Sequence, residues 1–254
     1  MNIAVITGAS SGLGEKFANL VDKVRNDIDE IWLIARRENR LKEVAKSLKK
    51  PTKVLKIDIT NCDDIENYKI ALNESGNNVK LLINNAGYGK LGRFDELTAE
   101  ENAGMIRLNC EALTVFTAVT LPLMANGGEI INTCSIASFA PNTSMAVYSS
   151  TKAFVMSLSR ALRLELKNRR INVLAACPGP MTTEFLAVAG IEKGNSKAFD
   201  RLPRVDAYKM AKGALKASKK KRAVYTNGIF YKFYRLVAKF LPKSIVMLLC
   251  GTEK

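Results

Sequence analysis

Strand patterns and helix patterns alternate along the chain of 254 residues, and this alternation limits the possible fold more than any other feature. Short apolar runs typical of buried strands are separated by stretches with apolar residues at helical spacing. The predicted strands cover 2–7, 31–35, 53–58, 79–83, 129–133 and 171–177, and the predicted helices cover 15–24, 38–48, 65–72, 98–124 and 145–167. This order predicts an α/β fold: one Rossmann-like domain with a doubly wound parallel sheet and helices on both faces.

Three glycines follow the first strand at once, in the sequence Gly8-Ala9-Ser10-Ser11-Gly12-Leu13-Gly14. Glycine lets the backbone approach a ligand closely, and the start of the next helix offers unpaired amides to a phosphate. The alternative is a glycine-rich turn that binds nothing. Ligands of doubly wound sheets lie beyond the carboxyl ends of the strands, where this turn and the other motifs below all fall.

The second strand ends in Arg36-Arg37, with no acidic residue before Glu38. In a dinucleotide site an acidic side chain at this place accepts from the ribose 2′-hydroxyl, whereas arginine suits a 2′-phosphate. The pattern therefore favours NADP over NAD. Two solvated surface arginines are the alternative.

Ser135, Tyr148 and Lys152 form the candidate reactive group. The chain has no histidine, which excludes histidine-based triads and the zinc sites that need histidine. Tyr148 and Lys152 are four residues apart and share a helix face, while Ser135 ends the apolar run before that helix. An ammonium near a phenol lowers its pKa from about 10 and suits it to proton transfer. An exposed helical pair without function is the alternative reading of the spacing alone.

With these residues the chain resembles the short-chain dehydrogenase/reductase family, over at least residues 2–183. Any one of its motifs is weak, but together and in order they are specific. They are TGxxxGxG at Thr7 to Gly14, NNAG at Asn84 to Gly87, the helix Asn109, Ser135, YxxxK at Tyr148 to Lys152, and PG at Pro178-Gly179.

The resemblance implies hydride transfer between a nicotinamide and a ketone or secondary alcohol. Tyr148 would exchange the proton, Ser135 would bind the substrate oxygen, Lys152 would lower the phenol pKa and bind the nicotinamide ribose, and Asn109 would hold a relay water. The implied NADP-binding residues are Gly8, Ser10, Ser11, Gly12, Leu13, Gly14, Arg36, Arg37, Asp58, Asn85, Ala86, Gly87, Tyr148, Lys152, Pro178, Gly179 and Thr183.

Among these, Asp58 would contact the adenine and Thr183 the carboxamide or the phosphates. The resemblance also suggests a homodimer or homotetramer built through helices 100–125 and 146–167. We predict no metal site. A non-catalytic NADP(H)-binding sensor or regulatory protein is the alternative function, although a sensor needs no proton relay.

The segment 181–203 sets substrate choice in this family. Its apolar residues and those of nearby loops predict a lipophilic ketone or alcohol, such as a steroid or a fatty chain. The alternative is that they only pack a lid on the core. These candidates are Tyr88, Phe139, Met145, Phe185, Leu186 and Ile191.

The tail departs from the compact family pattern. We divide the chain into a catalytic domain, 1–228, and a basic amphipathic extension, 229–254. After a seventh strand at 222–226, a helical pattern over 229–249 is broken at Pro242. Its apolar stripe is Phe230, Phe233, Tyr234, Val237 and Leu241, with Lys232, Arg235 and Lys239 away from its centre.

Between residues 207 and 252 there are eleven Lys and Arg and no Asp or Glu. We expect the stripe to pack within the protein or a dimer. Weak association with an anionic membrane surface is the alternative. Nucleic acid is not expected, because no recognition motif accompanies the charge.

Five scattered cysteines without a CxxC pair favour reduced thiols and a cytoplasmic protein. The N-terminus lacks the pattern of a signal peptide. No run reaches the roughly eighteen apolar residues of a spanning helix, and the richest, 112–125, contains Pro122.

Overall fold

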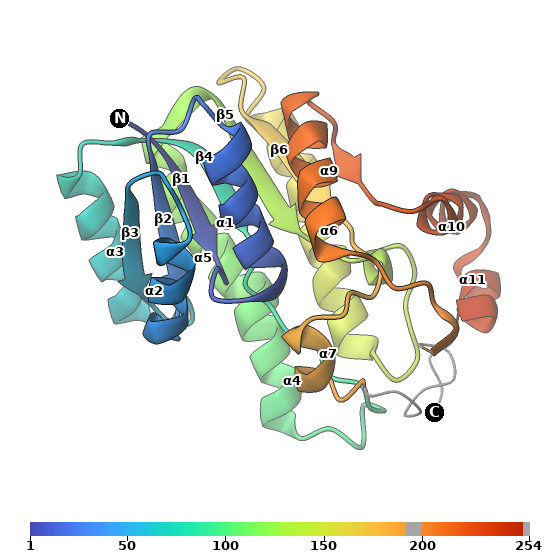
Figure 1. The fold of residues 1–254 in the computed structure, drawn as a ribbon. Coiled ribbons are helices and arrows are strands. Elements are labelled where there is room, and N and C mark those ends of the chain that lie inside the picture. Colours follow the sequence, from blue (N-terminus) through green and yellow to red (C-terminus); the bar gives the residue numbers. More distant parts are fainter. Residues whose placement is uncertain (192–199, 251–254) are drawn as a thin grey trace.

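The structure is a computed structural model that describes residues 1–191 and 200–250. One domain contains a parallel sheet of seven strands in the order β3-β2-β1-β4-β5-β6-β7, with helices on both faces (Figure 1). The predicted fold class is confirmed. The strands are β1 Asn2–Thr7, β2 Glu30–Ala35, β3 Thr52–Lys56, β4 Asn78–Asn84, β5 Met124–Thr133, β6 Asn172–Ala176 and β7 Val224–Tyr225.

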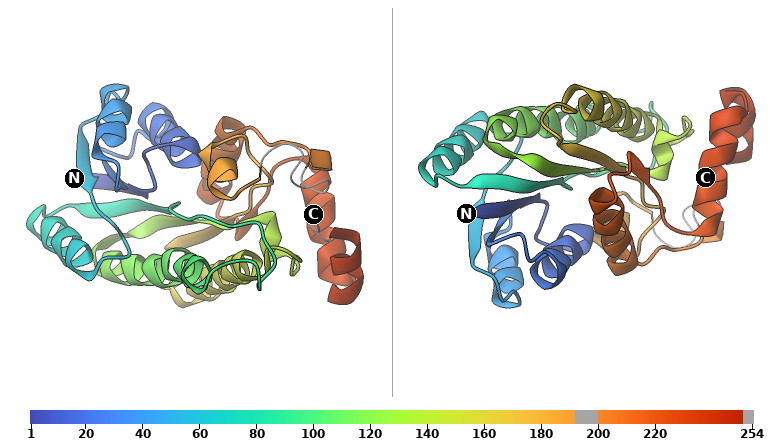
Figure 2. Two further views of the ribbon diagram at one scale, coloured as in Figure 1. Left: turned by 90° about the horizontal axis from the view of Figure 1, so that it is seen from below. Right: turned by 90° about the horizontal axis from the view of Figure 1, so that it is seen from above.

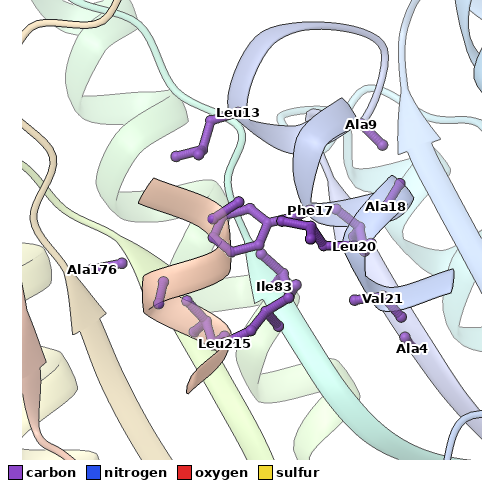
Figure 3. Close-up of a cluster of buried hydrophobic side chains, with 14 of the residues drawn as sticks. Ala4, Ala9, Leu13, Phe17, Ala18, Leu20, Val21, Ile83, Ala176 and Leu215 are labelled. Atoms are coloured by element: carbon purple, nitrogen blue, oxygen red, sulfur yellow. The ribbon is translucent and has the colours of Figure 1, made fainter. Parts of the chain in front are cut away.

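Two layers of helices enclose the sheet (Figure 2). The helices are α1 Gly12–Val24, α2 Glu38–Lys46, α3 Cys62–Glu74, α4 Ala99–Ile106, α5 Leu113–Thr120, α6 Ala146–Glu165, α7 Glu184–Val188, α9 Ala207–Lys219, α10 Ile229–Phe240 and α11 Lys243–Cys250. On one face α1 and α9 meet through Phe17, Leu20 and Leu215 (Figure 3). On the other face, the Phe116 ring of α5 stacks on Tyr68 of α3 with centroids 4.3 Å apart. Apolar side chains on both faces explain why the predicted strands read as continuous apolar runs.

Some boundaries differ from the predicted ones. Helix α1 begins at Gly12 rather than at residue 15, because the Ser11 carbonyl already accepts a hydrogen bond from the Glu15 amide. Strand β5 begins at Met124, five residues early, and passes through Gly127, whose φ of +74° favours glycine. Helices α7 and α9 are not among the predicted elements. Residues 192–199 of the predicted substrate segment lie outside the described residues.

A long helical stretch, Ala99–Leu123, runs from α4 through a π-helical turn, Arg107–Ala112, into α5. A capping box begins this stretch: Thr98 Oγ1 accepts from the Glu101 amide, and the Glu101 carboxylate accepts from the Thr98 amide. Among the described residues this is the one helix long and apolar enough to cross a membrane. From the sequence we expected no stretch of that kind. It packs on the sheet, and Thr117 accepts a hydrogen bond from buried Asn84 of β4.

The C-terminal extension forms two helices that stand at the β7 edge of the sheet, as Figures 1 and 2 show. The predicted break near Pro242 lies between α10 and α11. Within the single chain most of the predicted apolar stripe is unpacked, because Tyr231 and Ala238 are the buried residues of α10 while Phe230 and Phe233 are exposed. Packing of the stripe in a dimer stays a prediction. The stripe chosen from the sequence is centred on the wrong side, since α10 carries apolar residues around most of its circumference.

Candidate active site

A cavity of about 1240 Å³ opens at the carboxyl ends of the strands. It brings together residues predicted from widely separated motifs, so the placement of these motifs at one edge of the sheet is as expected. The predicted site residues on its wall are Gly8, Ser10, Ser11, Gly12, Leu13, Arg36, Arg37, Asp58, Asn85, Ala86, Gly87, Ser135, Tyr148, Lys152, Pro178, Gly179 and Thr183. Gly14 and Asn109 are not on the wall.

The glycine turn has the geometry of a phosphate cradle. Gly8 and Gly12 have φ values of +64° and +57°, which side chains disfavour. A Cβ on Gly8 would lie 2.9 Å from the Ala86 backbone, so the turn can approach the NNAG loop only with glycine there. Ser11, the N-cap of α1, makes no side-chain capping bond. The first amides of α1 are therefore suited to bind an anion such as a dinucleotide phosphate.

Gly14 has a structural role behind this turn. A Cβ at Gly14 would lie 2.2 Å from the Gly8 carbonyl oxygen. Gly14 is not on the cavity wall, and its contact with the cofactor stays a prediction. Its small size instead lets helix α1 pack closely against the strand-to-helix turn.

Arg36 and Arg37 take different partners at the end of β2. Arg36 is largely exposed, and its Nη1 lies 3.7 Å from an Asp58 carboxylate oxygen. Burial acts to raise the pKa of Asp58, but hydrogen bonds from Thr60 and the nearby Arg36 together lower it below its ordinary value. Arg37 Nη2 donates to Ser10, Ser11 and Glu184, at 3.2, 2.9 and 2.7 Å. Two guanidinium groups thus border the cavity beside the glycine turn.

Tyr148 and Lys152 lie one turn apart in the first half of α6, and both are buried. Lys152 Nζ donates to the Thr133 carbonyl at 3.0 Å and lies 5.8 Å from the centroid of the Tyr148 ring. The ring is held between Gly89, where a Cβ would lie 2.7 Å from it, and Phe185, whose ring centroid is 5.7 Å away. Tyr148 and Lys152 are therefore a buried pair, and the alternative reading of an exposed helical pair is wrong.

Burial dominates the electrostatics of this pair. Desolvation raises the pKa of Tyr148 well above its ordinary value, although the neighbouring Ser135 side chain acts to lower it. Desolvation also lowers the pKa of Lys152. From the sequence we expected Lys152 to lower the phenol pKa, whereas the pKa of Tyr148 is raised. Burial causes the difference, because both groups lose contact with solvent when the helix packs. The phenol is consequently held protonated at neutral pH.

Ser135 lies on the cavity wall directly after β5. It caps a short 3-10 turn, Ile136–Ser138, and its hydroxyl accepts from the Ala137 amide at 3.1 Å. Its side chain is buried. This hydrogen bond fixes the serine oxygen, and the Ser135 side chain neighbours the Tyr148 phenol.

Asn109 lies in the π-helical turn, which interrupts the α-helical hydrogen bonds at this point. Its amide Nδ2 donates to the Tyr88 carbonyl at 2.8 Å and to Thr151 at 3.1 Å, and its Oδ1 accepts from the Tyr88 amide. A Cβ on Gly87 would lie 2.9 Å from Asn109 Oδ1 and 3.4 Å from Lys152 Nζ. Asn109 therefore lies behind Gly87, next to the lysine, and joins the loop after β4 to α6.

Comparison with known proteins places this geometry in a family. A family model described as short chain dehydrogenase matches residues 2–193. This chain belongs to the short-chain dehydrogenase family. It is 31% identical over 207 residues to an uncharacterized oxidoreductase of Staphylococcus epidermidis, covering 81% of this chain and 88% of the relative. The protein is accordingly an oxidoreductase of this family.

Solved structures of family members agree with this placement. A short-chain dehydrogenase from Sphingobium yanoikuyae in complex with NADPH superposes with a TM-score of 0.81 at 32% identity, over 94% of this chain and 93% of that one. A bulky-bulky ketone specific alcohol dehydrogenase from Comamonas testosteroni gives a TM-score of 0.76 at 27% identity, over 96% of each chain.

The remaining part of the cavity of this short-chain dehydrogenase is largely apolar. Of the predicted substrate-lining residues, Tyr88, Met145, Phe185, Leu186 and Ile191 are on the wall. Phe139 is not on the wall, because its ring packs on Tyr234 with centroids 5.9 Å apart.

The sequence prediction missed several wall residues, namely Glu184, Phe230, Tyr231 and Tyr234. Glu184 could have been noticed as an acid in the first turn after Thr183, but nothing local in the sequence indicates its contact with Arg37. The three aromatic residues belong to α10, so the C-terminal extension forms part of the cavity.

Proposed function

We propose that the protein is an NADP(H)-dependent oxidoreductase that interconverts a lipophilic ketone and its secondary alcohol, with Tyr148 as the general acid and base. The observation that carries the proposal is the convergence of Ser135, Tyr148 and Lys152 on one cavity whose neighbouring wall is apolar. A carbonyl oxygen at that point would meet both a phenol and a serine hydroxyl.

The coenzyme residues fit a dinucleotide. The glycine turn and the first amides of α1 would hold its phosphates, and Asp58 would lie near the adenine. Bound in this way, a nicotinamide dinucleotide supplies or accepts the hydride. The predicted coenzyme residues come to the wall from the ends of β1, β2, β3, β4 and β6, so they would hold an extended molecule across the sheet edge.

The chain's own residues handle the proton. A neutral phenol is the form that donates, and burial keeps Tyr148 in that form for reduction of a ketone. The Ser135 hydroxyl would donate a hydrogen bond to the same oxygen. Lys152 lies close enough to stabilise negative charge on the phenol as the proton leaves. Asn109 would hold a relay water next to Lys152.

A preference for NADP(H) is supported by Arg36 and Arg37 at the end of β2, because guanidinium groups bind phosphate through paired hydrogen bonds. The similarity to the NADPH-bound Sphingobium protein points the same way. The lipophilic substrate class is supported by Met145, Phe185, Leu186 and Ile191. The similarity to a ketone-specific alcohol dehydrogenase agrees with a bulky carbonyl compound.

The experiment is a screen of ketones and secondary alcohols of increasing size, followed by the absorbance of NADPH. We expect turnover that increases with the apolar bulk of the substrate. A protein that binds NADPH and turns over no compound of the panel would support the alternative, a non-catalytic sensor.

Assembly into a homodimer or homotetramer is part of the same proposal. Val115 on α5, and Phe154 and Leu164 on α6, are exposed apolar side chains on the long helices expected to form the contact. Light scattering on the wild type and on Phe154→Glu tests it: a wild-type monomer would contradict the proposal. A cytoplasmic location also stays a prediction.

A further inference from the structure

Helix α10 presents a continuous apolar face to solvent. At helical spacing Ile229, Phe233, Leu236 and Phe240 fall on one side, and their exposed fractions are 86%, 64%, 54% and 71%. Large apolar residues scattered singly on a surface are ordinary, but four on one face of a short helix indicate a contact that the single chain does not make. The helix has 12 residues and is too short to span a bilayer, so a contact with lipid would place it along the membrane surface.

The opposite face of α10 is already occupied. The Tyr231 hydroxyl donates to the Pro203 carbonyl at 2.7 Å, and the Tyr231 ring covers Gly179. Ala238 is buried with Val246 of α11, and Tyr234 packs on Phe139. Lys243 Nζ donates to the Phe139 carbonyl at 2.7 Å and ties the start of α11 to the domain. Because these contacts fix the rotation of α10, its exposed face cannot turn inward without breaking them.

The charges beside this face identify its partner. Lys232, Arg235 and Lys239 follow one edge of the apolar face at helical spacing, and all three are exposed. There is no acidic residue from 207 to 252, where eleven Lys and Arg occur. A second copy of the chain would bring two such basic segments together, and a nucleic acid would meet phenylalanine and leucine at the centre of the face. A basic edge beside a row of large apolar side chains is the pattern of helices that lie in an anionic lipid surface.

We propose that α10 lies in the surface of an anionic lipid membrane, with Phe233 and Phe240 among the acyl chains and the basic edge at the phosphate groups. The helix would lie parallel to the bilayer plane, at the far end of the molecule from β3 (Figure 2). Binding requires both the apolar face and the positive edge.

The position of α10 gives this binding a consequence for the cavity. Phe230 is half exposed beside the apolar face and also lines the cavity, together with Tyr231 and Tyr234. A membrane-bound α10 would place this wall next to the lipid, where lipophilic ketones and alcohols dissolve. This consequence rests on the proposed function, whereas lipid binding itself does not, so binding is measured without coenzyme or substrate.

The test is co-sedimentation of the full chain with vesicles of phosphatidylcholine, with and without phosphatidylglycerol. We expect binding only when phosphatidylglycerol is present. Phe233→Ser/Phe240→Ser should lower the partition coefficient by about tenfold or more, since two phenylalanines no longer leave water. Lys232→Gln/Lys239→Gln should lower it by about fivefold for each charge removed.

Phe94→Ser is the matched control, because Phe94 is 67% exposed on a loop far along the chain from α10. It should bind as the wild type does. As a second readout, Phe240→Trp should show a blue shift of its fluorescence with anionic vesicles, above the constant signal of buried Trp32.

Three results would overturn the proposal. One is the absence of wild-type binding to anionic vesicles, and another is equal binding by the double serine variant. The third is a wild-type oligomer in the absence of lipid that Phe233→Ser/Phe240→Ser converts to a monomer, because the face would then be a subunit contact. Circular dichroism checks that the variants fold, which we expect since all substituted side chains are exposed.

Discussion

Arg37 and Glu184 lie 147 positions apart in the chain and form a salt bridge of 2.7 Å at the rim of the cavity. Arg37 also reaches the glycine turn through Ser10 and Ser11. Glu184 is in the first turn of α7, the helix that carries Phe185 and Leu186 on the substrate side. One ion pair therefore joins the proposed 2′-phosphate site to the segment that borders the substrate.

Glu184→Gln should strengthen NADPH binding by about threefold to fivefold and leave NADH binding nearly unchanged. The carboxylate competes with a 2′-phosphate for Arg37 and repels it, and an exposed charge pair is worth about 1 kcal/mol or less. Dissociation constants from fluorescence titration measure the effect. Glu66→Gln, which removes an exposed salt-bridge partner of Lys69 on α3, is the control. Weaker NADPH binding by Glu184→Gln would mean that Glu184 orients Arg37 instead of competing for it.

Arg36→Asp should weaken NADPH binding by about tenfold or more and NADH binding far less, because it replaces a guanidinium with a charge that repels the 2′-phosphate. The same titration, run with both coenzymes, gives the preference directly. Lys69→Asp on α3 is the control, since Lys69 is half exposed and not on the cavity wall. An unchanged preference in Arg36→Asp would show that the phosphate is bound elsewhere.

Gly179→Ala should destabilise the protein by about 1–3 kcal/mol, because its Cβ would lie 2.4 Å from the Tyr231 ring. The ring anchors α10, so the clash has to be relieved by moving this helix or the loop after β6. Urea unfolding measures the change in free energy. In a Tyr231→Leu background the same substitution should lower the free energy of unfolding much less. An equal loss in both backgrounds would show that the destabilisation does not come from the contact with α10.

Asp27→Asn should lower stability at neutral pH but not in acid. A hydrogen bond from the buried Arg25 holds the pKa of Asp27 below its ordinary value. A lowered folded-state pKa adds stability above the unfolded value of about 4, and this stability is lost as the pH falls through the folded-state pKa. The gain is at most about 1 kcal/mol, since Asp27 is half exposed. Urea unfolding of both proteins at several pH values checks this, and a difference independent of pH would contradict it.

Much of the fold and the catalytic group could be predicted because the signals are local. Apolar runs alternate with amphipathic stretches, and the motif residues follow strand ends that a parallel sheet places at one edge. The Arg37–Glu184 pair has no such signal, because the two residues are joined only when α7 folds back over the glycine turn.

Two further features depend on three-dimensional packing. Helix α10 has apolar residues on both its buried and its exposed face, so periodicity alone could not tell which side meets the domain. The direction of the Tyr148 pKa shift follows from desolvation by Gly89, Phe185 and their neighbours, which a spacing of Tyr and Lys cannot convey.

The central claim is that the Tyr148 hydroxyl exchanges the proton with the substrate oxygen. The most direct measurement compares kcat of Tyr148→Phe and wild type, on a ketone that the wild type reduces, with NADPH binding measured in parallel. The account predicts that kcat falls by about 100-fold or more while the NADPH dissociation constant changes little, because the ring stays in place and only the proton donor is lost. A variant that retains the wild-type kcat would contradict it.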